Sequence, residues 1–236
     1  MNFLPDDHPA CPIVAKAAGG RREIAGSVGV DSGQMVLSVG SFPTDHFNGK
    51  DVYGGPGYIA TSTGYGDGGY SVVRLLSDEG LVVGVEVVFV CTTADKAVFA
   101  EMVTVEGWGP GAEELSAYAD NKTSEERSAQ ISQWLERYDA VSREIWTEAM
   151  LRAVPTEEAK IIDAWTVEVP APGGVAVGDP CYMGPSMTVE LPPGTYIAAA
   201  WGAETDWGYR VVRTGLYAAA RGPLGRASSS AVPEQT

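Results

Sequence analysis

The chain has 236 residues, 44% of them hydrophobic and 20% charged, the composition of a soluble globular protein long enough to bury a core without metal or disulfide support. Its formal net charge of −15 gives a negative surface that repels phosphate backbones, which argues against direct nucleic-acid binding. Cys11, Cys91 and Cys181 lie far apart, so a disulfide framework and a zinc site are disfavoured and reduced thiols in a cytoplasm are expected.

Residues 1–22 mix Pro, Gly and Ala without a period and predict an extended N-terminal arm. The arm has no basic stretch followed by an apolar run, so it does not resemble a secretory signal. The longest apolar run, Leu81–Val90, is much shorter than the ~20 residues of a membrane-spanning helix. The sequence therefore predicts no contact with a membrane.

A first β module is predicted over residues 23–91. Glycines interrupt its apolar residues, which is typical of short strands joined by tight turns. The Asp31-Ser32-Gly33 turn separates the first two strands, and residues 40–56 are expected to form a polar loop. The remaining strands are predicted at Tyr58–Ser62, Tyr70–Leu76 and Leu81–Val90, with a hairpin turn at Gly80. The last strand is almost continuously apolar, as a strand covered on both faces would be.

An acidic helical insert is predicted over residues 92–160. Thr123-Ser124-Glu125-Glu126 has the spacing of a capping box, and the helix is expected to run until Pro155. Its apolar residues lie near one stripe: Ile131, Trp134, Leu135, Tyr138, Val141, Ile145, Ala149 and Met150. We interpret Trp134 and Tyr138 as packing residues. Shorter helices are expected after Thr93 and after Pro110.

A second β module is predicted over residues 161–220, followed by a disordered tail at 221–236. Asp67–Arg74 and Asp206–Arg213 match at six of eight positions. Two flanking matches support the repeat: Gly33–Phe42 with Gly173–Tyr182, and Pro56–Ala60 with Pro193–Ala198. The predicted fold is α+β, with two internally duplicated, mainly antiparallel β modules about a pseudo-twofold axis and the helical insert between them.

No catalytic residue, metal or cofactor is predicted. Cys181 would need a base or a positive field to act as a nucleophile, and the sequence places neither His8 nor His46 beside it. Turn aspartates could bind a hard cation, but none lies in a known metal loop, so local turn formation is favoured. The glycine-rich segment Gly64–Gly69 leads into a strand, whereas a phosphate loop leads into a helix.

Three motifs resemble a family of uncharacterised proteins of bacteria and their phages: Val30-Asp31-Ser32-Gly33-Gln34, Asp179-Pro180-Cys181-Tyr182 and Gly66-Asp67-Gly68-Gly69-Tyr70. The family carries the first two motifs in one module, whereas each copy here holds one of them. The resemblance covers the two β modules and implies a phage or prophage origin, but no known activity. If the family has a single site, this chain either assembles it from both copies or has lost it. The candidate ligand-binding residues are Asp31, Ser32, Gln34, Asp179, Cys181 and Tyr182.

The leading hypothesis is a non-enzymatic binding or structural protein that acts through protein contacts or self-association. It would work in the cytoplasm, or in the virion or host cytoplasm if a phage encodes it. The candidate partner-binding surface is an aromatic platform of Trp201, Trp207 and Tyr209. One alternative is a binder or hydrolase of a phosphorylated or nucleotide-like molecule at the module interface. The other is an acidic mimic that occupies a basic site on a host protein.

Overall fold

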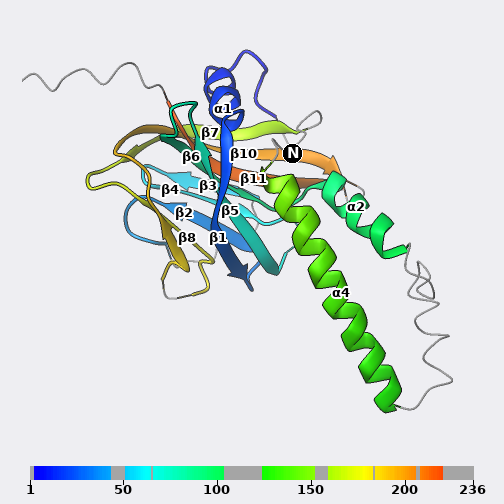
Figure 1. Cartoon of the computed structure of the whole chain (residues 1–236). Helices are drawn as coiled ribbons and strands as arrows, with labels where there is room; N and C mark the ends of the chain where they lie inside the picture. Colours follow the sequence, from blue (N-terminus) through cyan, green and yellow to red (C-terminus); the bar gives the residue numbers. More distant parts are fainter. Residues whose placement is uncertain are drawn as a thin grey trace, which may run out of the picture.

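The computed structural model describes residues 3–43, 51–64, 66–103, 124–151, 159–182, 184–205 and 208–219. Their strands form two antiparallel sheets, and the helices lie outside the sheets (Figure 1). The predicted α+β class, with mainly antiparallel strands, is therefore confirmed.

The larger sheet has six strands in the spatial order β1, β5, β6, β11, β10, β7, and every neighbouring pair is antiparallel. Their bounds are β1 Arg21–Val30, β5 Gly68–Leu76, β6 Val82–Val88, β7 Lys160–Val169, β10 Gly194–Thr205 and β11 Gly208–Ala218. The central position of β6 explains why its residues are buried without alternation from Gly84 to Val88.

The smaller sheet has five strands in the order β3, β4, β2, β8, β9. Their bounds are β2 Gln34–Ser38, β3 Val52–Gly55, β4 Tyr58–Ser62, β8 Val175–Gly178 and β9 Met187–Val189. The sheets pack face to face. At one corner the indole of Trp165 in β7 lies so close to Gly54 in β3 that a Cβ there would fall 1.6 Å from the ring, and Trp165 Nε1 donates to Gly55 O at 3.0 Å.

Strand β3 lies where the sequence predicted a loop. The prediction was wrong because Gly54 and Gly55 are typical of turns, whereas here they pair with Ile59 and Tyr58 of β4. The strand predicted at Tyr58–Ser62 is confirmed with the same bounds as β4. The hairpin at Gly80 is also confirmed, since β5 pairs with β6 and Gly80 N donates to Ser77 O at 2.9 Å.

Strands of both predicted modules share both sheets. β6 pairs with β11 in the larger sheet, and β2 pairs with β8 in the smaller one. The two segments that match best in sequence do not hold the same place in the larger sheet. Asp67–Arg74 falls mainly in β5, between β1 and β6, whereas the described part of Asp206–Arg213 lies in β11, between β6 and β10.

A helix, α1, runs from Ala10 to Ala18, where the sequence predicted an extended arm. It packs against β5, β6, β7, β10 and β11 of the six-stranded sheet, and Val14 is completely buried. The expectation of an extended arm was wrong because the Ala-rich segment is stabilised by the sheet beneath it, which its own sequence does not reveal.

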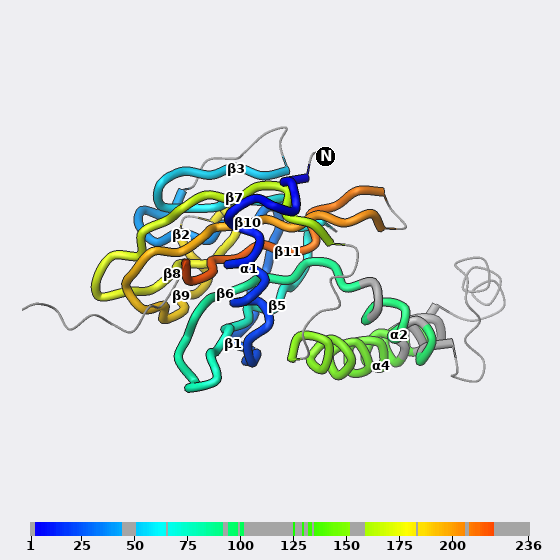
Figure 2. Tube along the Cα trace, turned by 90° about the horizontal axis from the view of Figure 1, so that it is seen from above, coloured from blue at the N-terminus to red at the C-terminus, as the bar shows by residue number. Residues whose placement is uncertain are grey.

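Two further helices lie side by side at one end of the molecule, α2 Thr92–Val103 and α4 Ser124–Leu151 (Figure 2). They match the helices predicted after Thr93 and over the capping-box segment. The helix predicted after Pro110 and the tail at 221–236 lie outside the described residues. None of the helices in the described ranges is long and apolar enough to cross a membrane.

Candidate functional site

The two loops that the sequence singled out meet in the structure. Asp179, after β8, points at the turn between β1 and β2. Its Oδ2 accepts hydrogen bonds from Asp31 N at 2.6 Å and Ser32 N at 2.8 Å. Its Oδ1 accepts from Ser32 Oγ at 2.5 Å and from Cys181 N at 2.8 Å. One carboxylate therefore joins two turns that lie almost 150 residues apart in the chain.

A second contact joins the same two turns, which we call the loop junction. Tyr182 Oη donates to Asp31 Oδ2 at 2.6 Å. Gln34, the remaining predicted ligand residue, begins β2 and pairs with Ser62 of β4. Asp31, Cys181 and Tyr182 are exposed, Ser32 is half-buried, and Asp179 is fully buried. The structure thus brings five of the six predicted residues into one hydrogen-bonded junction, while ligand binding there stays a prediction.

The charge state of the junction is set by its hydrogen bonds. Burial would raise the pKa of Asp179, but the hydrogen bonds from Ser32 and Cys181 outweigh it, and the pKa lies below its usual value. Desolvation, the hydrogen bond to Asp179 and the charges of Asp179 and Asp31 raise the pKa of the Cys181 thiol to about 11. The hydrogen bond to Asp31, followed by desolvation, raises the pKa of Tyr182 to about 12.

These values decide what the junction can do chemically. A thiol with a pKa near 11 is protonated at neutral pH and is a poor nucleophile, so Cys181 is not activated for catalysis. The Asp179 oxygens already accept hydrogen bonds from three backbone N–H groups, the Ser32 hydroxyl and the Cys181 thiol, which suits a carboxylate that holds two turns together. Within the described ranges, no group of three or more His, Cys, Asp or Glu residues is placed to hold a metal ion.

The predicted aromatic platform is not assembled as expected. Trp201 lies in the core with 8% of its surface exposed, so it does not form a surface with Tyr209. Tyr209 is half exposed and packs against Phe3, with ring centroids 5.9 Å apart. Trp207 lies outside the described residues.

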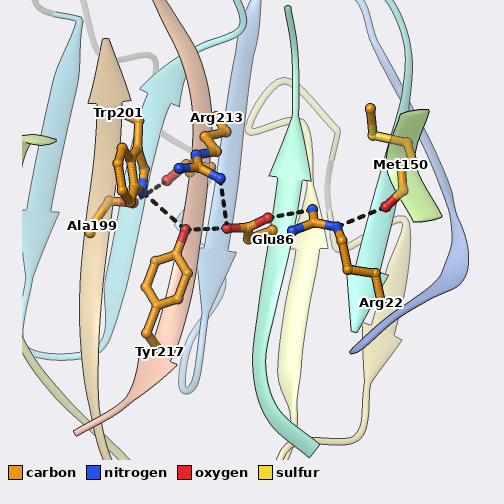
Figure 3. A network of polar contacts seen from close by, with 8 residues as sticks. Arg22, Glu86, Met150, Ala199, Trp201, Arg213 and Tyr217 are labelled. Atoms are coloured by element: carbon orange, nitrogen blue, oxygen red, sulfur yellow. Dashed lines mark hydrogen bonds and ion pairs between the residues drawn. The ribbon is translucent and has the colours of Figure 1, made fainter. Parts of the chain in front are cut away.

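A buried charge cluster, which the sequence analysis missed, lies at the centre of the larger sheet (Figure 3). Gly215 of β11 lies opposite Glu86 of β6, so Arg213 and Tyr217, two residues to either side, share the face of Glu86. Arg22 Nη2 contacts Glu86 Oε2 at 2.5 Å, and Arg213 Nη1 contacts Oε1 at 3.4 Å. Tyr217 Oη donates to the same Oε1 at 2.8 Å. These four side chains are buried.

The cluster holds two guanidinium groups for one carboxylate. Two neutral groups, a backbone carbonyl and an aromatic ring, stabilise the extra positive charge. Arg22 Nε donates to Met150 O at 2.7 Å, at the C-terminal end of α4, where the helix dipole is negative. The Arg213 guanidinium lies 3.7 Å from the centroid of the Trp201 ring, a cation–π contact. Although burial raises the pKa of Glu86, the two arginines outweigh it and hold the carboxyl ionised. The pKa of Tyr217 is raised by its burial and by Glu86, so the phenol stays neutral.

A single signal in the sequence points to this cluster. Glu86 is the one charged residue in the apolar run Leu81–Val90, and a charge in a strand covered on both faces must be paired. The identity of its partners could not be read from the sequence, because Arg22 and Arg213 are 64 and 127 residues away.

The comparisons with known proteins do not add a function. No protein-family model, no curated protein and no solved structure matches the chain. The resemblance to bacterial and phage proteins therefore stays a prediction, and function has to be argued from the residues described above.

Proposed function

We propose that the protein acts by binding another protein, without catalysis, and that helix α4 is the contact element. The observation that carries the proposal is that only part of the apolar stripe of α4 is covered by the sheets. At the C-terminal end of the helix, Ile145 and Ala149 of this stripe pack against the core. Farther toward the N-terminus the same stripe is on the surface, with Leu135 47% and Tyr138 39% exposed.

The helix is well suited to present this surface. Its last turns are anchored, since Met150 is fully buried and its carbonyl accepts the hydrogen bond from Arg22. Its 28 residues span about 42 Å, and the N-terminal part extends away from both sheets (Figure 1). An amphipathic helix gains most of its stability from packing of its apolar face, which favours a partner on the stretch that the sheets do not cover.

The charge of the chain indicates the kind of partner. Glu136 and Asp139 are exposed beside the stripe, and the whole chain carries a net charge of −15. A partner with an apolar centre and a rim of Lys or Arg fits this surface best. The acidic mimic considered above shares this charge argument, but it needs no apolar contact, and the exposed Leu135 favours the helix-mediated interaction.

The test compares two variants that add the same negative charge to opposite sides of α4. Leu135→Glu places a charge in the stripe, whereas Gln133→Glu places it about 200° around the helix. An apolar side chain buried at an interface contributes about 1.5–3 kcal/mol, so Leu135→Glu should weaken capture of the partner at least about tenfold. Capture from a lysate of the source organism, quantified by mass spectrometry against wild type, measures this.

The control should bind like wild type. Circular dichroism of both variants verifies that α4 is intact. Equal capture by wild type and Leu135→Glu would remove α4 as the contact element, and equal losses in both variants would indicate a purely electrostatic partner.

A second candidate function is the small-ligand site at the loop junction. The observation that favours it is that Asp31, Cys181 and Tyr182 are exposed together where two loops meet. Phosphorylated and nucleotide-like compounds should then raise the melting temperature of the wild type and leave that of Asp31→Asn unchanged. If no compound raises the melting temperature of the wild type, the hypothesis of a ligand site is wrong and these residues only hold the two loops together.

We also propose that the chain arose by internal duplication, as the repeated sequence suggests, but with a different alignment. From one edge of the larger sheet to its centre the strands are β1, β5 and β6, and from the other edge to the centre they are β7, β10 and β11. This symmetric order supports matching β1 with β7, β5 with β10 and β6 with β11. In the smaller sheet β2 then matches β8, as the alignment of Gly33–Phe42 with Gly173–Tyr182 predicts. The helices α2 and α4 would lie between the two copies.

A further inference from the structure

The half of the chain that holds β1–β6 meets the half that holds β7–β11 where β6 pairs with β11 and β2 pairs with β8, and we call this boundary the seam. We infer that the seam is a self-complementary interface, of the kind that joins two copies of a homodimer. The partner that each half fits is a second half of the same fold. The inference rests on the duplication proposed above and is independent of any partner bound by α4.

The first observation is the position of the strands that cross the seam. A twofold axis normal to a sheet pairs a central strand with its own equivalent, antiparallel, and places the other strands symmetrically to either side. The six-stranded sheet meets this condition at the pair β6 and β11. In the smaller sheet β2 and β8 also form an antiparallel pair and β4 then corresponds to β9, whereas β3 has no counterpart among the described strands. One axis can therefore pass between β6 and β11 and between β2 and β8.

The second observation is a repeated local structure at the starts of β5 and β10. Tyr70 Oη donates to the carbonyl four residues earlier at 2.8 Å, and Tyr196 Oη does the same at 2.8 Å. Each tyrosine is buried and follows, by two positions, a glycine with a φ of +157° or +150°.

The edge strands complete this match. Tyr70 pairs with Val28 of β1, and Tyr196 pairs with Val167 of β7. Gly68 pairs with Val30 of β1, and Gly194 pairs with Val169 of β7. Each of these valines lies two residues after the valine that faces the tyrosine. The same conformation, hydrogen bond and register in both places support a common ancestral pair of strands, β1 with β5 and β7 with β10.

The third observation is the chemistry of the seam. Glu86 from the first half is paired by Arg213 and Tyr217 from the second half. Asp179 from the second half binds the backbone of Asp31 and Ser32 in the first. A separated half would expose an open strand edge in each sheet. Separation would also leave Arg213 without its carboxylate and Asp179 without the hydrogen bonds from Asp31 and Ser32, whereas Glu86 would keep Arg22.

The test cuts the full chain once between the halves. A protease site is placed between residues 103 and 124, the protein is cleaved to completion, and the mass in solution is measured by light scattering. We expect both pieces to elute together at the mass of the uncut chain, 24.8 kDa, increased by the inserted site. Co-expression of the two pieces as separate chains gives the same readout without a protease.

A matched pair of variants tests whether the charge cluster holds the seam. Glu86→Gln in the cut protein should raise the dissociation constant of the two pieces at least tenfold. Arg74→Met removes an ion pair with Glu23 inside the first half, where both side chains are partly exposed, and should leave dissociation unchanged.

Pieces that separate after the cut would overturn the inference, and so would equal effects of the two variants. These results are distinguishable from failure of the proposed function, because Leu135 lies outside the seam. A cut protein that stays assembled but captures no partner refutes the role of α4 alone.

Discussion

Asp179 is a buried carboxylate whose oxygens are used by the chain itself. It accepts hydrogen bonds from the backbone N–H groups of Asp31, Ser32 and Cys181, from the Ser32 hydroxyl and from the Cys181 thiol. Charge-assisted hydrogen bonds of this kind are stronger than neutral ones, and losing the acceptor leaves the donors without a partner. At the residue scale, this side chain explains why two turns from distant parts of the sequence stay together.

We predict that Asp179→Asn lowers the free energy of unfolding by about 1–3 kcal/mol, measured by urea denaturation at neutral pH. Asp67→Asn, at an exposed turn, should cost less than about 0.5 kcal/mol. Because the pKa of Asp179 is lowered in the folded state, its contribution is present above the unfolded pKa of about 3.9 and is lost as the pH falls through the folded pKa. The difference between wild type and Asp179→Asn should therefore shrink in acid, and a difference independent of pH would contradict this.

Cys181 is exposed but chemically protected. With a pKa of about 11, its thiolate fraction at pH 8 is far below that of an ordinary cysteine, although the remaining thiolate is intrinsically more nucleophilic. We predict that iodoacetamide alkylates Cys181 at least about tenfold more slowly in the folded protein than in urea, followed by mass spectrometry of its peptide. The rate should keep rising up to about pH 11. A rate that levels off near pH 8 would show that Asp179 and Asp31 do not act on the thiol.

At the scale of elements, the buried charge cluster fastens α4 to the sheet. Arg22 joins the edge strand β1 to the central strand β6 through Glu86, and to the C-terminal end of α4 through the Met150 carbonyl. One buried guanidinium therefore adds a polar anchor to the apolar packing of Ile145, Ala149 and Met150 at this end of the helix. This arrangement links the seam of the sheets to the surface that we propose for partner binding.

We predict that Arg22→Met destabilises the protein by about 3 kcal/mol or more, because it leaves Glu86 with Arg213 as its one remaining cationic partner and removes the hydrogen bond to α4. Amide hydrogen exchange should rise in the last turns of α4 before it rises in β6. The matched change Arg74→Met breaks a partly exposed ion pair with Glu23 and should cost no more than about 1 kcal/mol. Similar costs for the two variants would mean that the buried cluster is not the anchor.

At the scale of the whole molecule, the proposed duplication makes a symmetric prediction. Tyr70→Phe and Tyr196→Phe each remove one hydroxyl that donates to a carbonyl four residues earlier. Each variant should lower the free energy of unfolding by about 1 kcal/mol, and the two losses should agree within about 0.5 kcal/mol. Urea denaturation of the single and double variants measures both values and their additivity. A large effect at one site and none at the other would argue against equivalent environments.

The amino-acid sequence alone determined the elements whose signals are local. The strand at Tyr58–Ser62, the hairpin at Gly80 and the long helix α4 follow from turn residues, periodicity and a capping box, all of which involve neighbours in the chain. The meeting of the Asp31 and Asp179 loops was expected from their motifs, and the structure brings them together.

The tertiary structure alone decided what depends on distant partners. Helix α1 and strand β3 need the surfaces on which they lie, and their own residues predict an arm and a loop. The burial of Trp201 and the pairing of Glu86 with Arg22 and Arg213 follow from strand order. The order of strands is set by which faces and edges bury together, and that free energy belongs to contacts between residues many tens of positions apart.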